Sequence, residues 1–182
     1  IRSCLVGSEM CIRDSTNAGD ATIDGFELEV NSNVGEDWTL SAGLTLLDSA
    51  YGDFLNTDAL QGDAGVLQNK GNPLNKAPKT SLNLGVVRNM ALESGSNLRI
   101  GLNAAYRSRT YFREFGQLDD SQPAYTVINL NDNLESADGM LVTRLFANNL
   151  TDEAYITGLS TGDSQYGRHA AWGMPRQIGI EV

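Results

Sequence analysis

Residues 98–107 read LRIGLNAAYR, and the apolar side chains fall on every second position. Neighbouring side chains of an extended strand point to opposite faces, so this spacing separates an apolar face from a polar one. The stretch therefore predicts a long β-strand whose two faces meet different surroundings. One face would carry Leu98, Ile100, Leu102, Ala104 and Tyr106, and the other Arg99, Gly101, Asn103, Ala105 and Arg107.

The same alternation occurs in GFELEV, WTLSAGLTL, SLNLGV and QIGIEV. The segments AYTVINLNDNL and MLVTRLFANNL carry apolar groups partly on both faces, which is typical of a strand that also packs against something inside. Several of these segments are longer than the ~5–6 residues usual in a soluble domain. We expect about seven strands, at residues 20–34, 37–50, 77–90, 97–111, 124–134, 140–149 and 171–182.

Short and long connections alternate strictly between these segments. Tight turns rich in Gly, Asp, Asn and Ser are expected at 35–37, 93–97 and 136–139, and long links at 51–76, 112–123 and 150–170. This arrangement puts every long loop at one end, as in barrels of the outer membrane. The predicted fold is all-β: an antiparallel meander forming a partial transmembrane β-barrel with short periplasmic turns and long extracellular loops.

Aromatic residues support a membrane-spanning sheet. Trp38 lies beside a short turn, and seven other aromatic side chains lie at strand ends near the long links, as interfacial girdles require. The alternative is that Tyr and Phe simply favour strands. Those seven residues are Tyr51, Phe54, Tyr111, Phe112, Phe115, Tyr125 and Tyr155.

A membrane-spanning sheet would turn its polar side chains toward a wet or plugged lumen. Seven strands cannot close a wide barrel, and lipid tolerates no open backbone edge, so the chain is expected to be a piece of a larger barrel. Where a strand leaves the membrane, the polar side chains of Asn148, Asn149, Thr151 and Asp152 are expected to close a turn in water. The expected lumen residues are Glu27, Glu29, Asn83, Arg99, Asn103, Arg107, Gln177 and Glu181.

The composition narrows the kinds of partner and of membrane-spanning element that the chain can have. The net charge of −10 argues against nucleic acid as a partner, and the chain lacks the run of ~18 apolar residues that a transmembrane helix needs. Both cysteines, Cys4 and Cys11, lie in IRSCLVGSEMCIRDS, which resembles a translated cloning adapter. We expect residues 1–15 to be a non-native or disordered leader, with a native segment as the alternative, and residues 16–182 to form the barrel portion.

Several motifs, in order, resemble the C-terminal part of a TonB-dependent outer-membrane receptor of Gram-negative bacteria: NAGDATIDGFELEV, NKAPKTS, LFANNLTDEAY and GMPRQIGIEV. The resemblance implies a 22-stranded barrel with a plugged lumen. It also implies uptake of a scarce ligand such as a ferric siderophore, cobalamin or an oligosaccharide, driven through the TonB complex. The family's plug and TonB-contacting segment are missing here, and the chain ends at Val182 rather than at the family's usual terminal aromatic residue.

The residues favour ligand binding over catalysis. The single histidine, His169, has no nucleophile or metal motif around it, so we expect no enzyme activity and no cofactor. Guanidinium and aromatic groups at a barrel mouth could hold an anionic or catechol-like ligand, unless the arginines pair internally with Glu114 or lumen carboxylates. The expected partner is thus a small-molecule or metal-chelate ligand. The candidates are Arg107, Arg109 and Arg113 with Tyr106, Tyr111 and Phe112, then Tyr166, His169 and Trp172 in the last loop.

A row of aspartates in the first long link allows a second interpretation of that loop. Carboxylates can bind Ca²⁺, but the spacing here is not that of an EF-hand, so we expect these residues to keep an exposed loop soluble. They are Asp48, Asp53, Asp58 and Asp63.

Two other functions remain open from the sequence. A passive outer-membrane porin would share the barrel but lack a plug. A soluble secreted β-sandwich, such as a carbohydrate-binding module, would instead turn its apolar faces toward each other in a closed core.

Overall fold

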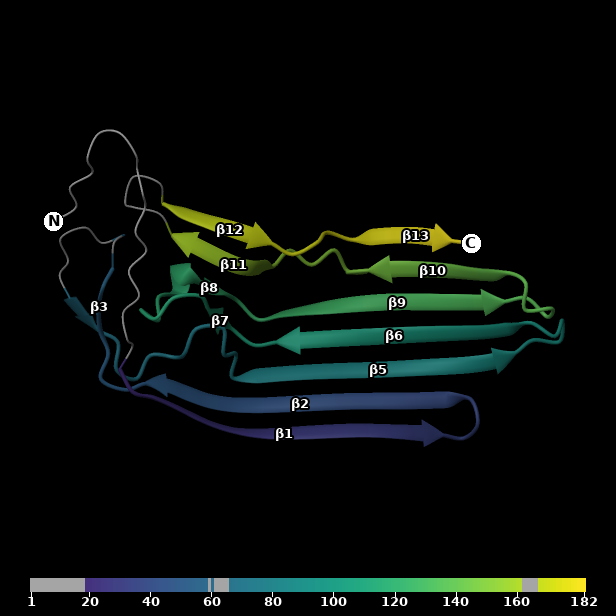
Figure 1. Cartoon of the computed structure of the whole chain (residues 1–182), viewed down its shortest axis with the longest axis horizontal. Helices are drawn as coiled ribbons and strands as arrows, with labels where there is room; N and C mark the ends of the chain where they lie inside the picture. Colours follow the sequence, from purple (N-terminus) through teal and green to yellow (C-terminus); the bar gives the residue numbers. More distant parts are fainter. Residues whose placement is uncertain (1–18, 59, 61–65, 162–166) are drawn as a thin grey trace.

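The computed structural model describes residues 19–58, 60, 66–161 and 167–182. Its main feature is one seven-stranded antiparallel sheet in which strands follow each other in chain order (Figure 1). These strands are β1 (Ala21–Val34), β2 (Trp38–Tyr51), β5 (Thr80–Ala91), β6 (Asn97–Arg107), β9 (Tyr125–Glu135), β10 (Val142–Asn148) and β13 (Gln177–Glu181).

The register confirms that the sheet has an apolar and a polar face. Residues directly opposite each other on paired strands share a face, and Leu28, Leu44, Leu82 and Tyr106 stand opposite one another across four strands. The neighbouring row, one residue along, contains Glu27, Thr45, Ser81, Arg107 and Tyr125. All eight side chains expected in the lumen lie on this second face.

The apolar face remains largely uncovered. Leu84, in the middle of the sheet, is 46% exposed, and Phe26 and Ile180 are 55% and 64% exposed. A sandwich would have buried these side chains against a second layer, so the soluble alternative is wrong. The uncovered face instead matches a strand surface that meets acyl chains.

The connections alternate as predicted. Gly35, Gly95 and Gly139 have positive φ angles at the short turns, which lie together at one end of the sheet. The long connections lie at the other end, and each contains a two-stranded ribbon that the sequence pattern did not indicate. These ribbons pair β3 (Leu55–Thr57) with β4 (Val66–Gln68), β7 (Thr110–Tyr111) with β8 (Ser121–Gln122), and β11 (Ile156–Thr161) with β12 (Arg168–Trp172).

Two strand predictions are wrong in extent. The strand expected at 97–111 divides into β6 and β7, because the Ser108 hydroxyl accepts a hydrogen bond from Thr80 N and ends the pairing. The strand expected at 171–182 divides into the end of β12 and β13. Pro175, which has no N–H, lies between them, and Arg176 N donates to Asp152 Oδ1 instead of to a strand.

The sheet is open rather than a closed barrel, because β1 and β13 each pair on one side within the described chain. A 3₁₀ turn at Leu118–Asp120 lies between β7 and β8. Among the described residues there is no helix with the length and hydropathy that a membrane crossing needs.

Candidate ligand-binding site

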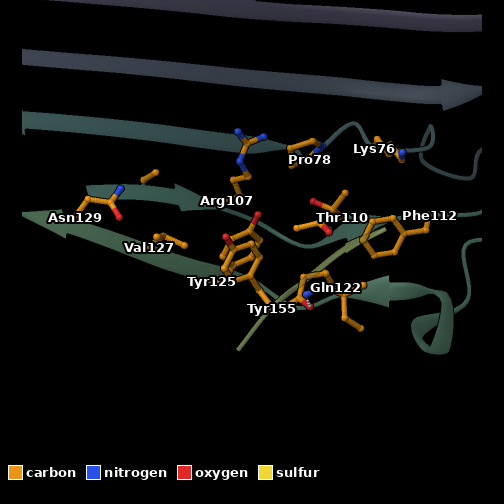
Figure 2. Close-up of a pocket in the computed structure, with 13 residues that line it drawn as sticks. Lys76, Pro78, Arg107, Thr110, Phe112, Gln122, Tyr125, Val127, Asn129 and Tyr155 are labelled. Carbon is orange, nitrogen blue, oxygen red and sulfur yellow. Dashed lines mark hydrogen bonds between the residues drawn. The ribbon is translucent and has the colours of Figure 1, made fainter. Parts of the chain in front are cut away.

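A pocket of about 440 Å³ lies on the polar face at the long-loop end of the sheet (Figure 2). Its floor comes from β6 and β9, where Arg107 stands opposite Tyr125 and Ala105 stands opposite Val127. Its walls come from the three long connections, which contribute Lys76, Thr110, Phe112, Gln122 and Tyr155 among others. Side chains far apart in the sequence therefore meet at one site.

An aromatic stack forms one side of the pocket. The rings of Tyr125 and Tyr155 are stacked with centroids 4.6 Å apart and an angle of 11° between their planes. Tyr155 also lies against Gly173, where an added Cβ would collide with the Tyr155 ring. Gly173 is therefore needed for the ring to reach Tyr125.

A polar turn after β10 fixes the position of Tyr155. Asn149, 3% exposed and with φ +51°, accepts a hydrogen bond from Glu153 N and donates through Nδ2 to the carbonyls of Glu153 and Met174. The expectation that the turn amides lie in water is wrong for Asn149, which is buried because it joins two backbone segments. We call the bonds of Asn149 to Glu153 and Met174, together with that of Asp152 to Arg176, the Asn149 latch.

The charge of the pocket is positive. Arg107 and Lys76 line it, and the lining residues include no Asp or Glu. Neither side chain forms an ion pair with any residue that the structure describes. In a chain with net charge −10, two uncompensated cations beside stacked tyrosines make a local site suited to an anionic, aromatic or metal-chelate ligand.

A buried ion cluster lies next to the pocket and joins three connections. Arg113 forms ion pairs with Asp58 and, at 2.8 Å, with Asp120. Asp120 also pairs with Arg168 at 2.6 Å. Asp58 and Asp120 are 1% and 0% exposed. Two positive and two negative side chains thus hold together the connections that contain β3, β7 and β12; we call them the four-charge cluster.

The cluster corrects one prediction and specifies another. Asp58 does not keep an exposed loop soluble, because it is buried against Arg113. Arg113 pairs internally, as the alternative to ligand binding predicted. Its partners are Asp58 and Asp120 rather than Glu114, which instead accepts a hydrogen bond from Asn56. Burial by itself lowers the pKa of Arg113, but hydrogen bonds and negative charge from the two aspartates outweigh burial and raise that pKa.

The other aspartates of the first link differ from one another. Asp53 is exposed and lies 3.1 Å from Lys70 Nζ, Asp48 is exposed on β2, and Asp63 lies outside the described residues. Within the described ranges, no group of three or more His, Cys, Asp or Glu side chains could hold a metal ion.

The expected ligand-binding residues lie in different places. Arg107 lines the pocket, with Phe112 beside it. Arg109 donates to Ser121 Oγ at 2.7 Å, and Arg113 belongs to the four-charge cluster. Tyr111 is half-buried in β7, and Tyr106 lies on the apolar face opposite Leu82.

The last-loop candidates are separate from the pocket lining. His169 and Trp172 are exposed on β12, and Tyr166 lies outside the described residues. Sequence reasoning did not select Lys76, Gln122 or Asn129 for the pocket. The signal that could have found Lys76 is its place in the NKAPKTS motif, where the structure gives it a constrained loop conformation with φ +57°.

Comparison with known proteins identifies the family. Residues 6–150 match the family described as TonB dependent receptor-like, beta-barrel. The chain belongs to the TonB-dependent receptor β-barrel family. Barrels of this family are proteins of the Gram-negative outer membrane, so the apolar face meets that membrane's lipids and the short turns are periplasmic.

Named relatives of this TonB-dependent receptor chain are siderophore receptors. A probable TonB-dependent siderophore receptor, PiuA of Acinetobacter baumannii, is 27% identical over 153 residues, which are 78% of this chain and 18% of that protein. The chain therefore spans about a fifth of the length of this relative.

Solved structures share the fold. The ferric yersiniabactin uptake receptor FyuA of Yersinia pestis superposes with a TM-score of 0.74 at 20% identity, over 90% of this chain and 23% of that one. The structure of PiuA from A. baumannii gives a TM-score of 0.69 at 22% identity, over 89% and 21%. The open sheet of this TonB-dependent receptor chain thus corresponds to part of a closed barrel.

Proposed function

We propose that this chain is the C-terminal part of the barrel of an outer-membrane receptor that takes up a ferric siderophore. The observation that carries the proposal is the pocket at the extracellular end of the polar face, where Arg107 and Lys76 lie beside the Tyr125–Tyr155 stack. Ferric siderophores are commonly anionic chelates with aromatic or oxygen-rich surfaces, which such groups bind by charge-assisted hydrogen bonds and stacking. The names of the relatives support the same ligand class over cobalamin or an oligosaccharide.

We further propose that uptake is energised through TonB by a plug domain on the part of the receptor that this chain does not include. This is what separates an active receptor from a passive porin of similar barrel shape. Its support is the family membership alone.

The first experiment measures binding to the intact receptor that carries this chain, purified in detergent. The probes are a ferric catecholate, a ferric hydroxamate, cyanocobalamin and a maltooligosaccharide, with tryptophan fluorescence as readout. We expect one of the ferric chelates to bind. We expect Arg107→Gln to weaken its affinity about tenfold, the effect of losing ~1.4 kcal/mol from a charge-assisted hydrogen bond.

Arg144→Gln is the matched control, because Arg144 is an exposed arginine on the same face that pairs with Glu181 away from the pocket. Binding of cobalamin or sugar without either ferric chelate would refute the ligand class. Equal effects of the two substitutions would refute the site but not the ligand class. Uptake of radioactive iron that continues after a protonophore collapses the inner-membrane gradient would indicate a passive pore.

A further inference from the structure

Arg88 and Asp132 are charged residues on the face that meets acyl chains, near its short-turn end, whereas Asp24 and Asp48 lie on the same face near its long-loop end. Across four neighbouring strands, β2, β5, β6 and β9, the register places Trp38, Arg88, Ile100 and Asp132 opposite one another in one row. This row belongs to the apolar face, since Leu40, Val86, Leu102 and Leu130 form the next row on that face. Trp38 begins β2 directly after the first short turn, so the row lies near the depth of the periplasmic headgroups.

Arg88 is oriented toward Trp38 rather than toward a carboxylate. Its Cζ atom is 5.0 Å from the centre of the Trp38 ring, and it forms no ion pair with a described residue. Beside it lies a groove of about 230 Å³ lined otherwise by Trp38, Val86, Met90, Ile100 and Leu102. The groove therefore combines an apolar trough with one cation at its edge.

Asp132 supplies the opposite charge. It stands between Ile100 on β6 and Leu145 on β10, and its Oδ1 atom is enclosed without a hydrogen-bond partner among the described residues. A carboxylate on a lipid-facing surface is costly unless a donor compensates it. Arg88 lies two strands away, about 10 Å between Cα atoms, and no bond joins the two side chains.

We propose that this row binds the headgroup of a glycerophospholipid that carries phosphoethanolamine. The lipid phosphate accepts hydrogen bonds from the Arg88 guanidinium. The lipid ammonium group donates to Oδ2 of Asp132, since Oδ1 is enclosed, and an acyl chain lies in the groove beside Trp38. A zwitterionic headgroup matches a cation and a carboxylate two strands apart. A phosphoglycerol headgroup has no ammonium, and a phosphocholine headgroup has no N–H to donate.

Native mass spectrometry of the intact receptor, supplied with equal amounts of phosphatidylethanolamine, phosphatidylglycerol and phosphatidylcholine, tests the proposal. We expect preferential retention of phosphatidylethanolamine. Arg88→Gln should reduce retention of phosphatidylethanolamine and phosphatidylglycerol about fivefold, because one basic residue near a lipid surface contributes ~1 kcal/mol. Asp132→Asn should reduce retention of phosphatidylethanolamine while leaving that of phosphatidylglycerol unchanged or higher.

Matched controls lie on the opposite face at the same end of the sheet. Arg99→Gln and Glu135→Gln remove equivalent charges from the polar face and should leave lipid retention unchanged. Arg88→Lys keeps the charge and should retain the lipid if Arg88→Gln fails to fold, with circular dichroism reporting the β-sheet. Equal retention of the three lipids, or equal effects of Arg88→Gln and Arg99→Gln, would overturn the proposal.

Discussion

At the scale of single residues, the position of the Tyr155 wall of the pocket depends on Asn149. Its side chain satisfies three backbone groups of two segments, and the backbone N–H of Asn149 donates to Asn129 Oδ1. Asparagine is one of the few residues that adopt positive φ readily, so the same residue solves the backbone and the hydrogen-bonding requirements of the turn.

Substitution of Asn149 by alanine should therefore destabilise the receptor by ~2–4 kcal/mol, since buried backbone groups lose their partners and alanine must adopt positive φ. Urea unfolding of the intact receptor in liposomes measures the change. Asn149→Gly removes the hydrogen bonds without the φ penalty and should fall between the wild type and Asn149→Ala. Asn148→Ala, at the exposed neighbouring position, should have little effect; a comparable loss there would contradict the role given to Asn149.

The turn after β10 and the face occupied by Arg107 could be predicted from the residue types alone. The run Asn-Asn-Leu-Thr-Asp indicated a turn at a strand end, and the alternation in 98–107 indicated which side of the sheet Arg107 occupies. The bond from Asn149 to Met174 was not predictable, because it joins residues 25 apart through a connection whose path the local pattern does not determine.

At the scale of elements, the four-charge cluster joins connections that the sequence separates widely. Arg113 lies 55 residues from Asp58, and Asp120 lies 48 residues from Arg168. The periodicity of apolar residues predicts strands, but it contains no information about which loops meet. The charged residues could therefore be listed from the sequence, but their ion-pair partners could not be predicted. The ribbons within the long connections were not predicted, because their strands are only two to six residues long and too short to show a clear alternation.

Asp120→Asn should release these connections from one another. It leaves the largely buried Arg113 and the more exposed Arg168 without the carboxylate they share, and loss of one partner in a buried ion pair typically costs ~3–5 kcal/mol. We expect faster cleavage of the long loops by trypsin, with the membrane-spanning strands still protected. Asp119→Asn, at the exposed adjacent position, should leave cleavage unchanged. Identical cleavage rates in both variants would show that the cluster does not hold the loops.

The short turn between β9 and β10 provides a pH-dependent prediction. Hydrogen bonds from the Ser136 hydroxyl and the Met140 N–H stabilise ionised Asp138 and lower its pKa below the ordinary value of 3.8. A carboxylate with a lowered folded-state pKa stabilises the fold above its unfolded pKa and loses this contribution as the pH falls through the folded value.

The difference in unfolding free energy between the wild type and Asp138→Asn should therefore be constant from pH 5 to pH 7 and shrink below about pH 4. Urea unfolding at a series of pH values measures it. Asp37→Asn, in the first short turn, is the comparison variant, and its unfolding free energy is measured over the same pH series. A difference that grows on acidification would mean that ionised Asp138 destabilises the turn.

At the scale of the whole molecule, the open sheet has one face for lipid and one for the lumen. Leu84 and Asn83 are adjacent on β5 and point to opposite faces, so they form a matched pair for testing this orientation. The alternation in the sequence was sufficient to predict the two faces, because burial in lipid and exposure to a lumen both follow the period of the strand. The closure of a barrel was not predictable in detail, because the described residues contribute one open seven-stranded sheet.

Leu84→Arg should destabilise the receptor in liposomes by ~2–4 kcal/mol, the cost of a cation at the middle of the lipid-facing surface. Asn83→Arg adds the same side chain to the lumen face and should cost far less. The measurement is the free energy of unfolding of each variant in liposomes. A larger loss for Asn83→Arg would mean that the two faces have been assigned the wrong way round.

The Asn149 latch has a mechanical consequence for the last long connection. It clamps both ends of the connection that carries β11 and β12, next to the points where that connection leaves β10 and enters β13. A force applied to that connection would therefore be borne first by these side-chain hydrogen bonds, before it reached the edge strand β13.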